Sequence, residues 1–238
     1  MSKQRKGKLY LIPTPLAENT LDKIVTPQMT EVIKGLDYFL VENLRTARRF
    51  VSSLKLGKVI EELHFKVLDK KTPEKMIQNL CAPLMDGKDI GVMSEAGCPG
   101  IADPGNLAVS FAHRHNIAVV PLVGPSAIFI ALMASGFNGQ SFAFHGYLPI
   151  EKQKRIQAIK ALEKDSANKK QTQIFMETPF RNDHLLLDVL NACQSHTQLC
   201  VAKDINGSEE MIRTLSIKDW KKSIPQLHKV PTVFLINC

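Results

Sequence analysis

The chain lacks the patterns that identify the commonest cofactor and metal sites. No G-x-G-x-x-G follows its first expected strand and no G-x-x-x-x-G-K-[ST] occurs anywhere, so the usual dinucleotide and nucleoside triphosphate sites have no support. There is no H-E-x-x-H motif and there are no clustered histidines. Ser126 also lacks the G-x-S-x-G context of a hydrolase nucleophile. We therefore expect no metal ion and none of these phosphate-binding loops.

Cysteine is scarce and unpatterned. The five cysteines are odd in number and never form C-x-x-C, which argues against a disulfide framework or a zinc site and predicts a reducing, cytoplasmic location. The first eight residues are basic but lack the apolar stretch of a signal peptide. No apolar run approaches the length of a membrane span, so we expect no membrane segment.

Positive charge is in excess. The 238 residues include 31 Lys and Arg against 23 Asp and Glu, a formal charge of +8. Such a balance favours a polyanionic partner such as RNA, although lysine-rich solvated surfaces have the same composition. We expect the basic stretches 152–170 and 203–222 to attract this partner, with Lys152, Lys154 and Arg155 among the contributing side chains.

The first half of the chain alternates between strand-like and helix-like segments. This alternation predicts a mostly parallel sheet with helices on both faces. Thr72 and Gly87 read as the start and stop of the third helix. The expected strands are 8–12, 37–41, 59–63, 89–94 and 117–122, and the expected helices are 27–34, 46–54, 73–86, 106–115 and 128–135.

The pattern changes near residue 140. A hairpin is expected around Gly207, and among the last four strands of this half only the first two have a helix between them. We therefore predict a second domain with a mixed sheet, giving an α/β protein of two domains, residues 1–138 and 139–238. The expected strands are 142–147, 173–176, 199–202, 211–215 and 232–236, and the expected helices are 151–170 and 182–193.

The stretch Ser94–Gly105, S-E-A-G-C-P-G-I-A-D-P-G, is the most informative part of the chain. It has three glycines and two prolines between a strand and a helix, which allow close approach to a ligand and hold one backbone shape. Asp103 and Pro104 read as the N-cap and first turn of the next helix. A rigid loop at the carboxyl end of a strand is where open α/β sheets bind small molecules, the alternative being a long structural turn.

Three further loops leave strands at their carboxyl ends, at 13–16, 42–45 and 123–127. In a parallel sheet such loops meet at one edge. We expect them to join the 95–105 loop in lining one site.

Six motifs occur in order along the chain: L-Y-L-I-P-T-P from residue 9, E-N-L-R from 42, S-E-A-G-C-P and D-P-G within 94–105, P-L-V-G-P-S-A from 121, G-Y-L-P from 146 and F-M-E-T-P-F-R from 175. Together they resemble the tetrapyrrole methylase superfamily, the class III methyltransferases that use S-adenosylmethionine (SAM). They are most similar to the branch containing ribosomal RNA small subunit methyltransferase I, which methylates a cytidine 2′-hydroxyl of 16S rRNA.

The resemblance implies two α/β domains with SAM in the cleft between them, and a homodimer. It places Pro13, Gly124 and Pro125 in the loops around the cofactor and adds Thr232 from the last strand. The implied direct contacts are Leu16, Cys98, Ile101, Ser126, Ala127 and Met176.

A ribose hydroxyl is a poor nucleophile, so a base or hydrogen-bond acceptor would assist methyl transfer. Glu42, Glu95 and Asp103 are the candidates, and Arg45 is a candidate phosphate ligand. Each has a structural alternative: Asp103 as a helix cap, and Glu42 with Arg45 as an ion pair.

Several positions depart from the pattern of the branch. Asn43 and Leu44 replace D-T in E-D-T-R, Glu95 replaces the Asp of S-D-A-G, and K-D-I-N-G from residue 203 replaces R-E-L-T-K. Three functions therefore stay open: an RNA methyltransferase, a methyltransferase for a corrin-like ring, and a catalytically silent RNA-binding protein. The second is disfavoured because P-T-P-L at 13–16 replaces the glycine-rich opening loop of corrin-ring members.

Overall fold

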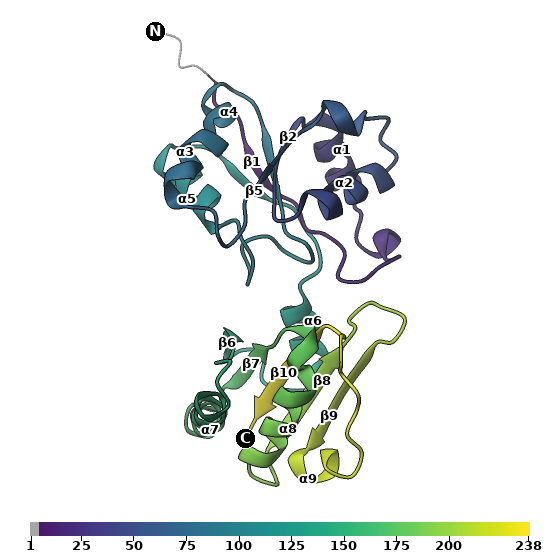
Figure 1. The fold of residues 1–238 in the computed structure, drawn as a ribbon, viewed down its shortest axis with the longest axis vertical. Coiled ribbons are helices and arrows are strands. Elements are labelled where there is room, and N and C mark those ends of the chain that lie inside the picture. The colour runs from purple at the N-terminus through teal and green to yellow at the C-terminus, as the bar shows by residue number, and fades with distance from the viewer. Residues whose placement is uncertain (1–4) are drawn as a thin grey trace. The chain divides into compact units, whose positions relative to one another are not determined.

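The computed structural model describes residues 5–238 and divides the chain into two compact units that meet at Pro125 and Ser126 (Figure 1). The sequence places a boundary later, after residue 138. The intervening helix α6 (Ala127–Ser135) packs with the second unit, because Phe129 meets Phe142 edge-on and the Ser135 carbonyl accepts a hydrogen bond from Thr214 at 2.8 Å.

The first unit contains an all-parallel sheet, as the alternation predicts. Its strand order is β3-β2-β4-β1-β5, and β4 is buried along its whole length, which is typical of a central parallel strand. The strands are β1 (Leu9–Leu11), β2 (Tyr38–Val41), β3 (His64–Val67), β4 (Ile90–Met93) and β5 (Val119–Pro121).

Helices cover both faces of this sheet, with α1 and α2 on one side and α3 and α5 on the other (Figure 1). Alternate residues of β2 point to opposite faces, so Phe39 joins the core under α1 and α2 while Leu40 joins the core under α3 and α5. The helices are η1 (Leu21–Lys23), α1 (Pro27–Gly35), α2 (Leu44–Ser53), η2 (Ile60–Glu62), η3 (Glu74–Met76), α3 (Ile77–Leu80), α4 (Ala82–Met85) and α5 (Asn106–Arg114), where η denotes a 3₁₀ turn.

Two predictions for this unit are wrong. The strand expected at 59–63 is the turn η2 followed by β3, whose exposed His64 and Lys66 suit an edge strand. The helix expected at 73–86 is broken into η3, α3 and α4, because Pro83 has no N–H to donate and stands in the first turn of α4. Thr72 caps no helix, since its hydroxyl donates to Asp69 at 2.8 Å.

The second unit contains the predicted mixed sheet, in the order β6-β7-β10-β8-β9. Only β6 and β7 pair in parallel, and β8 and β9 form the expected hairpin. The remaining elements are β6 (Phe142–Tyr147), α7 (Lys152–Lys169), β7 (Thr172–Met176), η4 (Pro179–Arg181), α8 (Asn182–Ala192), β8 (Gln198–Lys203), β9 (Met211–Ser216), α9 (Ile217–Trp220) and β10 (Thr232–Asn237).

Arg155 on α7 does not contribute to a basic surface, contrary to the prediction. It is 7% exposed and its guanidinium donates two hydrogen bonds to Asp188, at 2.6 and 2.8 Å. A buried charge needs such a partner, so neutralising Arg155 would leave an unpaired carboxylate inside the unit. Over the part of the chain that the structure describes, no helix is both long and apolar enough to traverse a bilayer.

Candidate functional site

Three loops interlock at the carboxyl edge of the first sheet. The loop after β1 joins the loop after β4 through paired backbone hydrogen bonds between Thr14 and Gly97, at 2.9 and 3.1 Å. The loop after β5 joins them as well, because the Cys98 thiol donates to the Pro125 carbonyl at 3.3 Å. Leu16 and Cys98 are half-buried, and Ile101 is 47% exposed. The first unit thus brings together six of the sequence-predicted cofactor residues, namely Pro13, Leu16, Cys98, Ile101, Gly124 and Pro125.

Glycine is required at two points of this loop cluster. Gly97 has a φ of 73°, and a side chain there would also press on Leu16, whose Cδ2 would lie 3.2 Å from an added Cβ. At Gly124 an added Cβ would overlap Cβ and Cγ of Pro13. The loops after β1, β4 and β5 are therefore in contact with no room for extra atoms between them.

Three carboxylates lie near the same edge. Glu42 follows β2, and its Oε2 accepts a hydrogen bond from the backbone N–H of Glu95 at 3.2 Å. The hydroxyl of Thr46 donates to Glu95 Oε1 at 3.4 Å. Burial, together with the negative charges of Glu42 and Glu95, raises the pKa of Asp103 to about 6, while Lys70 partly opposes the shift. The geometry thus gives one carboxylate an unusually high affinity for a proton.

Asp103 is not the N-cap of α5, which corrects the structural alternative drawn from the sequence. The N-cap is Gly105, with a φ of 141°, and the helix receives no side-chain capping bond. The turn closed by the Gly100 N–H on the Pro104 carbonyl, at 3.1 Å, separates Asp103 from the first turn of the helix. The Asp103 carboxylate is therefore available for another role.

Asn43 has a defined structural role at the start of α2. Its Oδ1 accepts from the backbone N–H groups of Arg45 and Thr46, at 2.9 and 3.2 Å, which makes it the N-cap. Asn and Asp are equally good caps, so this departure from the E-D-T-R pattern preserves the helix start. Within residues 5–238 the Arg45 side chain forms no ion pair, so the proposed Glu42–Arg45 pair is not found.

Two residues near this edge, Thr46 and Lys70, are not predicted from the sequence. Thr46 reaches Glu95 across 49 residues of sequence, and Lys70 acts on Asp103 through its charge. No local pattern marks either residue, because only the parallel sheet brings these segments to one edge.

The second unit holds the other four predicted cofactor residues. Ser126 precedes α6 without capping it through its side chain, and Ala127 is the first helical residue. Met176 ends β7 opposite Val233 of β10, so Thr232 begins β10 at the same end of the sheet. The Thr232 hydroxyl donates to the Val230 carbonyl at 3.0 Å.

An ion pair between the buried Glu177 and the half-buried Arg181 fixes the turn after Met176. Glu177 is 3% exposed, and its Oε1 accepts from the Thr178 N–H at 2.7 Å and from Arg181 at 2.6 Å. These residues belong to the F-M-E-T-P-F-R motif. The ion pair between Glu177 and Arg181 of that motif therefore holds the end of β7 in place.

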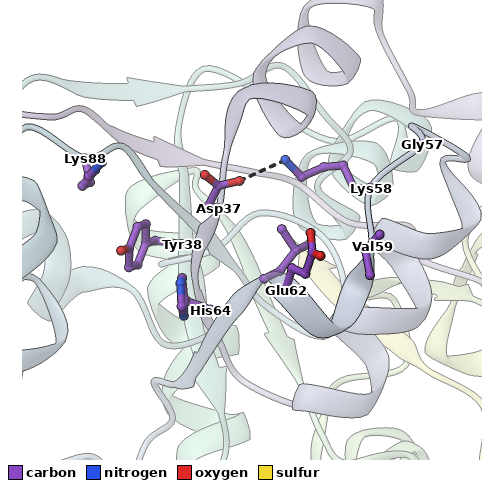
Figure 2. Close-up of a pocket in the computed structure, with 9 residues that line it drawn as sticks. Asp37, Tyr38, Gly57, Lys58, Val59, Glu62, His64 and Lys88 are labelled. Carbon is purple, nitrogen blue, oxygen red and sulfur yellow. Dashed lines mark hydrogen bonds and ion pairs between the residues drawn. The ribbon is translucent and has the colours of Figure 1, made fainter.

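A pocket of about 420 Å³ lies at the opposite, amino edge of the first sheet (Figure 2). There Lys58 pairs with Asp37 at 3.2 Å, and the rings of Tyr38 and His64 stack with centroids 4.7 Å apart. Its charges balance, with Lys58 and Lys88 against Asp37 and Glu62, and none of the motif loops reaches it. The loop cluster at the carboxyl edge is therefore the candidate functional site. In the described part of the chain, no three His, Cys, Asp or Glu side chains gather so as to hold a metal ion.

Comparisons with known proteins identify relatives of the chain by sequence and by fold. No family model matches the chain. Proteins named ribosomal RNA small subunit methyltransferase I are similar to it over most of its length. The one from Vibrio cholerae is 30% identical over 211 residues, covering 89% of this chain and 69% of the relative. Those from Halalkalibacterium halodurans and Buchnera aphidicola are 33% and 28% identical, covering 82% and 97% of this chain and 64% and 79% of the relatives.

Solved structures support the fold. The methyltransferase CobJ aligns over 97% of this chain and 94% of its own with a TM-score of 0.65 at 15% identity. Uroporphyrin-III-C-methyltransferase from Thermus thermophilus aligns over 97% and 92% with a TM-score of 0.55 at 18% identity. The two α/β units therefore have the tetrapyrrole methylase fold. Because it has relatives at 30% identity or more, the chain belongs to the family of ribosomal RNA small subunit methyltransferase I.

Proposed function

We propose that this protein is a SAM-dependent methyltransferase that acts in the cytoplasm on a ribose 2′-hydroxyl of ribosomal RNA. The names of its relatives support methyl transfer to small-subunit RNA. The single structural observation that carries the proposal is the position of Asp103, whose pKa is raised to about 6 beside Glu42 and Glu95 at the loop edge.

The loop cluster fits SAM chemically. Leu16 and Cys98 are half-buried and offer apolar surface, and Ile101 exposes 47% of its surface, as an apolar wall for a ligand would. SAM would supply an electrophilic methyl group on a sulfonium that is already an excellent leaving group. The residues that would hold it are Pro13, Leu16, Cys98, Ile101, Gly124 and Pro125 in the first unit, and Ser126, Ala127, Met176 and Thr232 in the second.

The protein's chemical task is then to position and activate the acceptor oxygen. Asp103 is ionised at neutral pH yet is more basic than an ordinary aspartate, which suits it to take the proton of a ribose hydroxyl as that oxygen gains a methyl group. Glu42 and Thr46 orient Glu95 through its backbone N–H and its carboxylate. Arg45, exposed at the first turn of α2, is placed to bind a phosphate of the RNA.

Transfer of label from SAM tests the proposal. Purified protein is incubated with methyl-labelled SAM and small ribosomal subunits from a strain that lacks the gene, and we expect label in the RNA as a 2′-O-methyl nucleoside. Subunits from the parent strain, already methylated, are the control. Label found only in tetrapyrroles would contradict the RNA assignment, and SAM binding without transfer to any fraction would contradict catalysis.

We also propose that the protein is a homodimer. Helix α6 is apolar on all sides, leaving Phe129 52% and Met133 83% exposed. Phe129 meets Phe142 of β6, an edge strand with one neighbour in the sheet. A second copy of the chain suits this apolar surface, because isologous pairing covers the same surface on both subunits.

Replacing Met133 with Glu is expected to convert the dimer into a monomer, because the charge would have to be buried without a partner. Light scattering coupled to size-exclusion chromatography measures the mass. Ile224→Glu is the control, since Ile224 is also 46% exposed but lies outside α6 and β6. A Met133→Glu protein that stays dimeric would contradict this interface.

A further inference from the structure

Helix α2 carries three arginines on one face. Arg45, Arg48 and Arg49 are exposed and occupy positions i, i+3 and i+4, which are neighbours on a helix surface. Ala47, Phe50 and Val51 are buried and fix the orientation of the helix on the sheet. We call Arg45, Arg48 and Arg49 the arginine face.

Local electrostatics do not explain these arginines. The first turn of α2 contains no acidic residue, and across the described residues none of the three forms an ion pair. Like charges at this spacing repel each other, and Arg45 stands near the positive end of the helix dipole. A bound anion would relieve this repulsion and stabilise the arginine face.

The arginine face begins at the candidate site. Asn43 caps α2, and Thr46 in its first turn donates to Glu95 at 3.4 Å. Further along, the Arg48 guanidinium lies over the Phe65 ring of β3, 5.7 Å from its centre, which fixes its direction. Arg45 and Arg49 are about 6 Å apart along the helix axis, at 1.5 Å per residue.

We propose that the arginine face binds consecutive phosphates of the RNA strand and so directs the acceptor ribose towards Asp103. Guanidinium groups suit this role because they bind phosphate oxygens through two parallel hydrogen bonds. The inference rests on the proposed function and adds the surface along which the RNA approaches. An acidic protein partner is the competing occupant.

The double substitution Arg48→Gln with Arg49→Gln tests the proposal. Binding of a fluorescent small-subunit RNA fragment is measured against salt concentration. Losing two phosphate contacts is expected to reduce the salt slope of log K by about 1.4–1.8 and to weaken binding about tenfold or more near physiological salt. Lys34→Gln with Lys88→Gln is the matched control. It removes the same charge from exposed residues at the amino edge of the sheet and should leave the slope almost unchanged.

Two further proteins separate charge from folding. Arg48→Lys with Arg49→Lys should keep most of the salt slope. Arg49→Gln alone leaves the contact between Arg48 and Phe65 intact and should reduce the salt slope by about half as much as the double Gln substitution does. Two results would overturn the proposal and favour an acidic protein at this face. One is an unchanged salt slope in Arg48→Gln with Arg49→Gln, and the other is an equal loss of salt slope in the control Lys34→Gln with Lys88→Gln. Failure of the proposed function would differ, because wild-type protein would then transfer no label to ribosomal RNA.

Discussion

Asp103→Asn is expected to slow methyl transfer about 10²–10⁴-fold while making the folded protein more stable at neutral pH. A positioned general base contributes about that factor, and an amide cannot accept the proton. SAM affinity should change little, because Asp103 is assigned to the acceptor. Single-turnover transfer to ribosomal subunits measures the rate, and calorimetry measures SAM binding.

The stability gain follows from the pKa. The pKa of Asp103 is 3.8 when the protein is unfolded and about 6 when it is folded, so the folded state binds a proton more tightly at pH values between these two. The contribution of Asp103 to wild-type stability therefore falls as the pH rises from about 4 to about 6 and is constant above, where the ionised group opposes folding. After allowance for partial exposure, Asn should add about 1–2 kcal/mol to the free energy of unfolding at pH 8 and nothing near pH 4.

The pH dependence of the rate provides a second measurement. Wild-type transfer should rise about tenfold per unit below pH 6 and level above it, as the Asp103 carboxylate ionises. Glu95→Gln is the comparison, because it removes a neighbouring charge and should move the midpoint to lower pH. A full rate in Asp103→Asn, or a midpoint that Glu95→Gln leaves in place, would show that Asp103 is not the base.

Gly124→Ala is expected to weaken SAM binding about 10–100-fold. The new methyl group would overlap Pro13, so the loops after β1 and β5 must separate. Overpacking of this kind costs about 1–3 kcal/mol, and each 1.4 kcal/mol is tenfold in affinity. Isothermal titration calorimetry with SAM measures the effect.

Gly35→Ala is the matched control for that substitution. Gly35 ends α1 in the same unit and has nothing within 4 Å of an added Cβ, so affinity should not change. A Gly124→Ala protein that binds SAM as wild type does would show that the contact with Pro13 does not shape the cofactor site.

The sequence predicts the site loops well because their residues act locally. Glycines and prolines at 94–105 set the backbone shape, and the buried run before them is unmistakable as a parallel strand. Features that depend on distant partners were not predictable. Arg155 is buried because it pairs with Asp188, which lies 33 residues further along the sequence. Asp103 does not cap α5, because Gly105 is the N-cap.

Asn43 bears on how divergence in this family is judged. An alignment that counts acidic residues would score position 43 as a lost catalytic group. In the structure the position contributes one amide oxygen to two backbone N–H groups, a duty that Asp and Asn perform interchangeably. Exchange between the two is therefore close to neutral for the helix, and it can accumulate in descendants that share one substrate.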